Sequence, residues 1–189
     1  MANILGLSGS LRRGSFNTAL LHEAATLMPA GSTLDIRTIH GIPVYNADDE
    51  AEHGVPDAVT QLKDAFAAAD GVILSTPEYN NSIPGAFKNA IDWMSRPPAD
   101  IKRVFGSKPV AMIGASPGGF GTTLSQVGWL PVLRTLGVDL WTGGRLLVSR
   151  AGSVFDEKGT LKDDAVRQQL QAFLQGFATF AESRRKGTR

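Results

Sequence analysis

The stretch Gly71-Val72-Ile73-Leu74-Ser75 predicts a strand buried on both faces, because its apolar residues follow one another without the alternation of a half-exposed strand. Similar apolar runs predict further strands at residues 4–7, 109–114 and 145–149. Residues 32–39 alternate apolar and polar side chains instead, which predicts a strand near a sheet edge with one polar face. Strands that are apolar on both faces are typical of a parallel sheet covered by helices.

Segments with helical spacing of apolar residues separate these strands. They are residues 16–28, 56–69, 84–94, 122–136 and 161–183, and Pro131 is expected to interrupt or kink the fourth. Residues 40–55 contain glycine, proline and three consecutive acids, which predicts a long connection of the kind that is often functional. The alternation of strands and helices predicts an α/β fold, in which a parallel sheet carries helices on both faces.

Composition limits the class of protein. The chain has 189 residues, of which 42% are hydrophobic and 20% charged, and we expect one folded domain over residues 1–189. A net charge of +1 gives no broad basic surface for nucleic acid. The absence of cysteine excludes disulfides, thiolate metal sites and a cysteine nucleophile.

The sequence also carries information on cellular location and metal binding. The N-terminal residues lack the features of a signal peptide, and no apolar run is long enough to span a membrane, so we expect a cytoplasmic protein without a membrane partner. The histidines at positions 22, 40 and 53 do not have the spacing of metal ligands, and no metal site is expected.

The loop after the first predicted strand is rich in groups that bind anions. Its sequence is Ser8-Gly9-Ser10-Leu11-Arg12-Arg13-Gly14-Ser15-Phe16-Asn17-Thr18, and it leads into a helix N-terminus, where backbone N–H groups and the helix dipole favour negative charge. We predict phosphate binding by Ser8, Ser10, Ser15, Asn17 and Thr18, with Arg12 or Arg13 as the charge partner. The loop matches neither G-x-x-x-x-G-K-[ST] nor G-x-G-x-x-G. The simpler alternative is that Ser15 only caps the helix.

A second loop follows the most apolar strand. It runs Thr76-Pro77-Glu78-Tyr79-Asn80-Asn81-Ser82-Ile83-Pro84-Gly85, with prolines that restrict the backbone at both ends. Tyr79 offers a flat apolar face, and Glu78, Asn80 and Asn81 offer polar groups or exposed backbone amides. This set suits a planar heterocycle with polar edges, although the same residues could form only a turn.

A third loop, Ala115-Ser116-Pro117-Gly118-Gly119-Phe120-Gly121-Thr122-Thr123, again lies between a strand and a helix. Its glycines allow the backbone to approach a ligand closely, or they make a flexible connection. Open parallel sheets bind ligands beyond the carboxyl ends of their strands. Because all three loops follow strands of one predicted sheet, we expect them to form one ligand site.

Six segments of the sequence resemble the NAD(P)H-dependent FMN reductase family, whose members include quinone, chromate and azo-dye reductases. They are Ser8–Arg12, Gly14–Asn17, Ala69–Gly71, Thr76–Asn80, Ile83–Gly85 and Lys88–Trp93, and the likeness covers roughly residues 3–136. The resemblance implies a flavodoxin-like three-layer sandwich, whose five parallel strands lie in the order 2-1-3-4-5 with helices on both faces.

The resemblance also implies the roles of particular residues. The FMN phosphate would contact Ser8, Ser10, Arg12, Ser15, Asn17 and Thr18, and the isoalloxazine ring would contact Pro77, Glu78, Tyr79 and Asn80. The pyrimidine end of the ring would contact Ser116, Gly118 and Gly119. Family members pass hydride from NAD(P)H to the flavin N5 and then to a quinone, chromate, azo or flavin acceptor, so no catalytic side chain is expected.

Family members are usually dimers or dimers of dimers, so a homodimer or homotetramer is expected. Trp93, Trp129 and Leu130 are candidate contact residues, although core packing explains them at least as well.

Two other functions share some of these features. A flavodoxin-type electron carrier without its own NAD(P)H activity would have the same fold and cofactor, but such carriers tend to be strongly acidic and this chain is not. A regulatory module that senses a phosphorylated ligand would need only the first loop.

Overall fold

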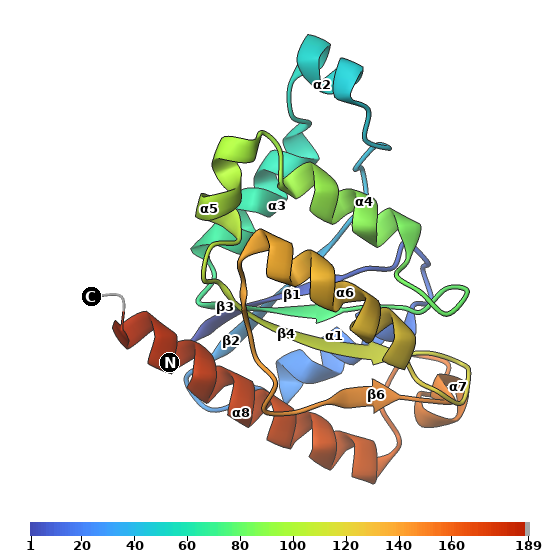
Figure 1. The fold of residues 1–189 in the computed structure, drawn as a ribbon. Helices are drawn as coiled ribbons and strands as arrows, with labels where there is room; N and C mark the ends of the chain where they lie inside the picture. The colour runs from blue at the N-terminus through green and yellow to red at the C-terminus, as the bar shows by residue number, and fades with distance from the viewer. Residues whose placement is uncertain (188–189) are drawn as a thin grey trace.

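A computed structural model describes residues 1–187 and contains a parallel sheet between two layers of helices (Figure 1). The strands lie in the order β2-β1-β3-β4-β5, which confirms the order implied by the resemblance, and β6 also pairs with β4. All of these strand pairs are parallel. The strands are β1 (Asn3–Ser8), β2 (Thr33–Thr38), β3 (Gly71–Ser75), β4 (Pro109–Ala115), β5 (Asp139–Leu140) and β6 (Leu146–Val148).

Each face of the sheet has its own hydrophobic core. One face packs against α1 (Phe16–Thr26) and α8 (Asp164–Gly187), and the other packs against α3 (Asp57–Ala68), α4 (Gly85–Met94) and α6 (Thr123–Leu136) (Figure 1). The short elements are η1 (Pro98–Asp100), α5 (Ile101–Val104) and α7 (Ala151–Val154). All five residues of β3 are buried, as their uninterrupted apolar run predicted.

The connection predicted at residues 40–55 contains a helix, α2 (Ala47–His53), which stands away from the sheet (Figure 1). None of its residues is buried, so no apolar periodicity marked it in the sequence. The Asn46 side chain caps it by accepting the N–H of Asp48. The Glu50 carboxylate ties it to the body of the protein by accepting hydrogen bonds at 2.9 Å from Tyr45 and from Arg96.

The strand predicted at 145–149 is confirmed as β6, but β5, which shares the fifth position of the sheet with it, was not predicted. Register pairs stop at Val110↔Leu140 and resume at Ile113↔Leu146, so Met112 has no strand partner on that side. Between them the chain turns at Trp141, whose ring centroid lies 4.9 Å from that of Phe173 on α8. Trp141 therefore holds the segment between β5 and β6 against α8.

Two sequence predictions concern α6 and its surroundings. α6 continues as one helix through Pro131, so the helix is not interrupted there. Trp93 and Trp129 are only 1% and 0% exposed and belong to the core, whereas Leu130 is 43% exposed. The tryptophans therefore do not present a contact surface. No helix within residues 1–187 is long and apolar enough to cross a membrane.

Candidate functional site

The three loops predicted from the sequence meet at the carboxyl edge of the sheet. The last residues of neighbouring strands are aligned, with Ser8 opposite Ser75 and Ala115 opposite Val148. The Gly9 N–H donates to the carbonyl of Ser75 at 2.9 Å, which joins the first loop to the end of β3. The sheet therefore brings all three loops to one edge.

The first loop, residues 8–18, presents a set of unpaired backbone donors. These N–H groups have no hydrogen-bond partner among the described residues, and they belong to Leu11, Arg13, Gly14, Ser15, Phe16 and Asn17. The last two lie in the first turn of α1, where the helix dipole adds partial positive charge. Such a set fits a phosphate group, which accepts several hydrogen bonds at once.

The hydroxyl groups of this loop mainly hold its shape. Ser8 is fully buried and shares a hydrogen bond of 2.8 Å with the Thr18 hydroxyl. Ser10 accepts the N–H of Arg12, and Ser15 caps α1 by accepting the N–H of Thr18. The hydroxyl hydrogens of Ser10 and Ser15 have no acceptor among residues 1–187, so both can still donate to a ligand.

The Asn17 side chain is buried and faces β4 and β3. Its amide nitrogen donates to the carbonyl of Ala115 at 2.9 Å, and its oxygen accepts the Ala115 N–H at 3.0 Å. The Ser75 hydroxyl donates to the same oxygen at 3.2 Å. The side chain predicted as a phosphate ligand thus joins α1 to two strand ends, and the backbone N–H of Asn17 is available to an anion.

The two arginines of the loop differ in their surroundings. Arg12 donates from Nε to the Gly14 carbonyl at 3.1 Å, and its guanidinium lies 5.3 Å from the centre of the Phe16 ring. Arg13 is exposed and forms no ion pair or hydrogen bond through its side chain with the rest of the described chain. Both place positive charge at the loop.

The second loop directs its side chains two ways. Pro77 is buried, and the Glu78 carboxylate turns toward α6, where Oε2 accepts the backbone N–H groups of Leu124 and Ser125.

Tyr79 is 52% exposed, and its backbone pairs with that of Ser82. Asn80 and Asn81 between them have φ angles of 49° and 60°, in the left-handed region that asparagine tolerates. The aromatic face of Tyr79 is therefore free at the edge, while the Glu78 carboxylate is engaged.

The third loop leaves open space above Gly118 and Gly119. The Ser116 hydroxyl donates to the Gly121 carbonyl, and the Gly118 carbonyl accepts the Arg150 N–H at 2.9 Å, which fixes the backbone. A Cβ built on Gly119 would meet no atom within 4 Å. A flat ligand can therefore approach this backbone closely.

Polar residues that the sequence did not indicate connect the second loop with α6. Thr76 and Ser125 share a hydrogen bond of 2.8 Å between their hydroxyl groups, and the Trp129 indole N–H donates to the Thr76 hydroxyl at 3.0 Å. All three residues are fully buried. Their separation of about fifty positions in the chain left no local signal for this contact.

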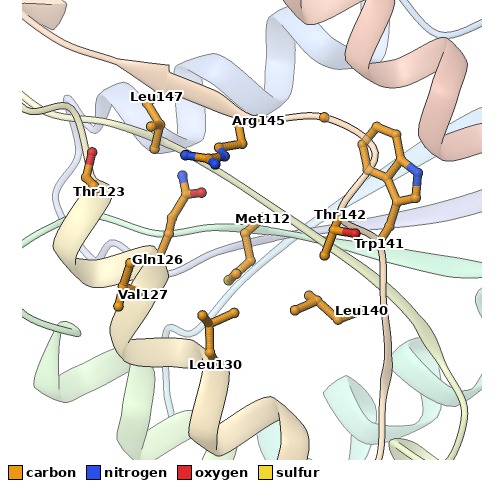
Figure 2. A pocket seen from close by; sticks show the side chains of 11 residues that line it. Met112, Thr123, Gln126, Val127, Leu130, Leu140, Trp141, Thr142, Arg145 and Leu147 are labelled. Atoms are coloured by element: carbon orange, nitrogen blue, oxygen red, sulfur yellow. The ribbon is translucent and has the colours of Figure 1, made fainter.

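Two cavities flank the edge. One, of about 330 Å³, lies between α6 and residues 140–147, with the Arg145 guanidinium directed toward the Gln126 amide at one end and mainly apolar side chains, together with Thr123 and Thr142, around the rest (Figure 2). The other, of about 900 Å³, lies between the first loop with α1 and residues 152–162. The predicted ring-binding residues Pro77–Asn80 line neither cavity, so a ring bound by them would lie on the open edge.

Comparisons with known proteins agree on one family. The model of the NADPH-dependent FMN reductase family matches residues 2–152. An NAD(P)H-dependent FMN reductase from Pseudomonas aeruginosa is 44% identical over 172 residues, which cover 91% of each chain. A 2-hydroxy-1,4-benzoquinone reductase from a Burkholderia species is 37% identical over 177 residues, 94% of each chain. The structure of a flavoenzyme NAD(P)H:(acceptor) oxidoreductase from Paracoccus denitrificans superposes with a TM-score of 0.83 at 31% identity, covering 97% of this chain and 99% of the other.

Proposed function

The chain belongs to the NADPH-dependent FMN reductase family, and on that premise we propose that it uses bound FMN to pass hydride from NAD(P)H to a quinone acceptor. The observation that carries this proposal is the set of unpaired N–H groups in the first loop, at the same edge as the second and third loops. The enzyme is an NAD(P)H-dependent oxidoreductase, and its family uses FMN.

The first loop would hold the FMN phosphate. Its free backbone N–H groups and the hydroxyls of Ser10 and Ser15 would donate to phosphate oxygens, and Arg12 would supply charge. Ser8, Asn17 and Thr18 would act mainly by keeping this backbone in place, through the hydrogen bonds that their side chains make within the protein.

The other two loops would position the ring. Pro77, Tyr79 and the backbone at Asn80 would contact the isoalloxazine, and the backbone from Ser116 to Gly119 would lie along its pyrimidine end. FMN, when bound, supplies the hydride-accepting chemistry. Backbone N–H groups near the pyrimidine edge would favour negative charge there, so no acidic or basic side chain is required.

The acceptor class follows from the open edge. Tyr79 and Phe120 are exposed aromatic residues, 52% and 80%, on the second and third loops, and they offer apolar faces to a planar molecule. A related protein is named for a hydroxylated benzoquinone. We place quinones first, and chromate, azo and free flavin acceptors are further candidates for the same open site.

We also propose that the 189 residues form a single reductase domain that assembles as a homodimer or homotetramer. Leu124, Val127 and Leu130 are each more than 40% exposed and recur every three residues along α6, so they form an apolar stripe beside the site. Light scattering of the purified protein and of Val127→Asp tests this assembly, since a charge in the stripe should shift the mass toward that of one chain.

The reductase proposal is tested by anaerobic spectroscopy of the FMN-loaded protein. Addition of NADH or NADPH should bleach the visible flavin band, and a benzoquinone should then restore it. FMN that binds but is bleached by neither nucleotide would favour an electron carrier. A protein that binds no FMN would contradict the proposal.

A further inference from the structure

The N-terminus of α6 is capped by a residue from another loop. Thr122 occupies the N-cap position, but its side chain makes no capping hydrogen bond, and its hydroxyl accepts from the Gln126 amide. Glu78 takes this role, accepting the N–H of Leu124 at 2.8 Å and that of Ser125 at 3.1 Å. A carboxylate at this position also complements the positive end of the helix dipole.

Buried hydrogen bonds behind Glu78 strengthen the same connection. The Thr76 hydroxyl bonds to Ser125 in the first turn of α6 and to Trp129 one turn later, and it donates to the Pro77 carbonyl at 3.0 Å. Polar groups without access to water are costly to separate, so these bonds hold the start of the second loop against α6.

Gly114 makes this close approach possible. A Cβ at that position would lie 2.0 Å from the Thr122 hydroxyl and 2.5 Å from the Thr76 carbonyl oxygen. Only a residue without a side chain lets β4, the second loop and the beginning of α6 meet there. The third loop, which ends at Thr122, is therefore fixed at one end to β4 and at the other to an α6 terminus that the second loop holds.

We propose that Glu78 is a positioning residue that sets the third loop relative to the second through the N-terminus of α6. The proposal rests on the proposed function, in which both loops contact the flavin ring. In this role Glu78 does not touch the ring, in contrast to what the resemblance implied. Its carboxylate stays on α6, away from the edge where the ring gains negative charge on reduction.

The test compares Glu78→Ala, which removes the cap, with Glu78→Gln, which keeps an acceptor oxygen. Glu52→Ala removes an exposed carboxylate from α2 and serves as the matched control. Amide hydrogen exchange is measured on the protein without FMN, and FMN affinity is measured by fluorescence titration. Thr76→Val, which removes the buried hydroxyl, probes the same connection without changing charge.

In Glu78→Ala we expect exchange of residues 117–125 to accelerate about five-fold, the typical effect of losing a helix cap, with α3 unchanged. The FMN dissociation constant should rise by a similar factor. In Glu78→Gln both the exchange rate of residues 117–125 and the FMN dissociation constant should stay close to the wild-type values. Thr76→Val should also accelerate amide hydrogen exchange in residues 117–125.

Faster exchange confined to Leu124 and Ser125, with unchanged FMN affinity, would overturn the proposal by reducing Glu78 to a local cap. Equal loss of FMN affinity in Glu78→Gln and Glu78→Ala, without faster exchange in residues 117–122, would show instead that the carboxylate touches the ring. If the wild-type protein bound no FMN, the proposed function would fail, and the exchange result would still report on the connection itself.

Discussion

The side-chain amide of Asn17 pairs with both backbone groups of Ala115, donating to the carbonyl at 2.9 Å and accepting the N–H at 3.0 Å. The Asn17 side chain takes the place of a strand partner for Ala115, the last residue of β4, beyond the last register pair between β3 and β4, Ser75↔Ile113. It holds the N-terminus of α1 at a fixed place above the strand ends. The geometry of the first loop depends on this contact.

Asn17→Ala should lower the free energy of unfolding, because the Ala115 N–H and carbonyl lose their partner. The expected cost is roughly 1–3 kcal/mol for each group that remains unsatisfied. Urea denaturation of the FMN-free protein measures it, with Asn3→Ala as a control in which an exposed amide is removed and the change should stay within about 0.5 kcal/mol. Unchanged stability together with lost FMN binding would identify the amide as a direct phosphate ligand.

Ser15 has two roles that substitutions can separate. Ser15→Ala should destabilise the protein by about 0.5–2 kcal/mol, because α1 loses its N-cap, and should also weaken FMN binding. Ser15→Asp should keep the cap and the stability, since aspartate caps helices as well as serine, yet repel the phosphate. Thermal unfolding and FMN titration of both variants check this. Full FMN affinity in Ser15→Asp would place the phosphate elsewhere.

Gly119→Ala tests how closely the ring approaches the third loop. The added methyl group meets no protein atom, so the FMN-free protein should unfold at the same urea concentration as the wild type. FMN affinity should fall, because the methyl group would occupy space that the ring needs. Gly152→Ala, also free of contacts, is the control that should leave affinity unchanged. Equal affinity in both variants would place the ring away from Gly119.

Glu50 should make the attachment of α2 sensitive to acid. Burial alone would raise the pKa of this carboxyl, but hydrogen bonds from Arg96 and Tyr45 outweigh it, and the pKa lies below its ordinary value. A carboxyl whose pKa is lowered by folding stabilises the folded protein at pH values above its pKa in the unfolded chain, which is about 4.3 for glutamate. This stabilisation is lost as the pH falls through the pKa of the carboxyl in the folded protein. The wild type should therefore lose stability below about pH 4.3.

Glu50→Gln should be less stable than the wild type at pH 7, and the difference should shrink as the pH falls below about 4. Urea midpoints at several pH values measure both proteins. Glu52→Gln, whose carboxyl is 77% exposed, should follow the wild-type curve. A difference between wild type and Glu50→Gln that does not depend on pH would contradict the assignment of this acid response to Glu50.

Local patterns were enough to place the three loops and every strand of the sheet except β5. The uninterrupted apolar run at residues 71–75 and the alternation at 32–39 predicted an inner strand and an edge strand, and the structure has both. The loops lie where strands end, so their positions followed from the strands. The helix at residues 47–53 could not be found by periodicity, since it buries nothing, but the Asn46 cap and the acids after it were a usable signal.

The directions in which side chains point could not be predicted from the sequence, because they depend on contacts between segments that are distant in the chain. Asn17 and Glu78 are polar residues in loops at the candidate site, and both turn their side chains to neighbouring elements. Trp93 and Trp129 fill the core, although their size would also suit an interface. The split of the fifth strand depends on Trp141 reaching Phe173, 32 positions later in the chain.

That split has a consequence for the behaviour of the protein at high concentration. A long exposed edge strand is a template on which another chain can add a strand and begin to aggregate. Here one edge offers only two and three residues of strand, separated by the detour at Trp141. The other edge, β2, carries Asp35 and Arg37, which are both charged and exposed. Neither border of the sheet presents a continuous apolar ladder, so the native protein resists edge-to-edge polymerisation.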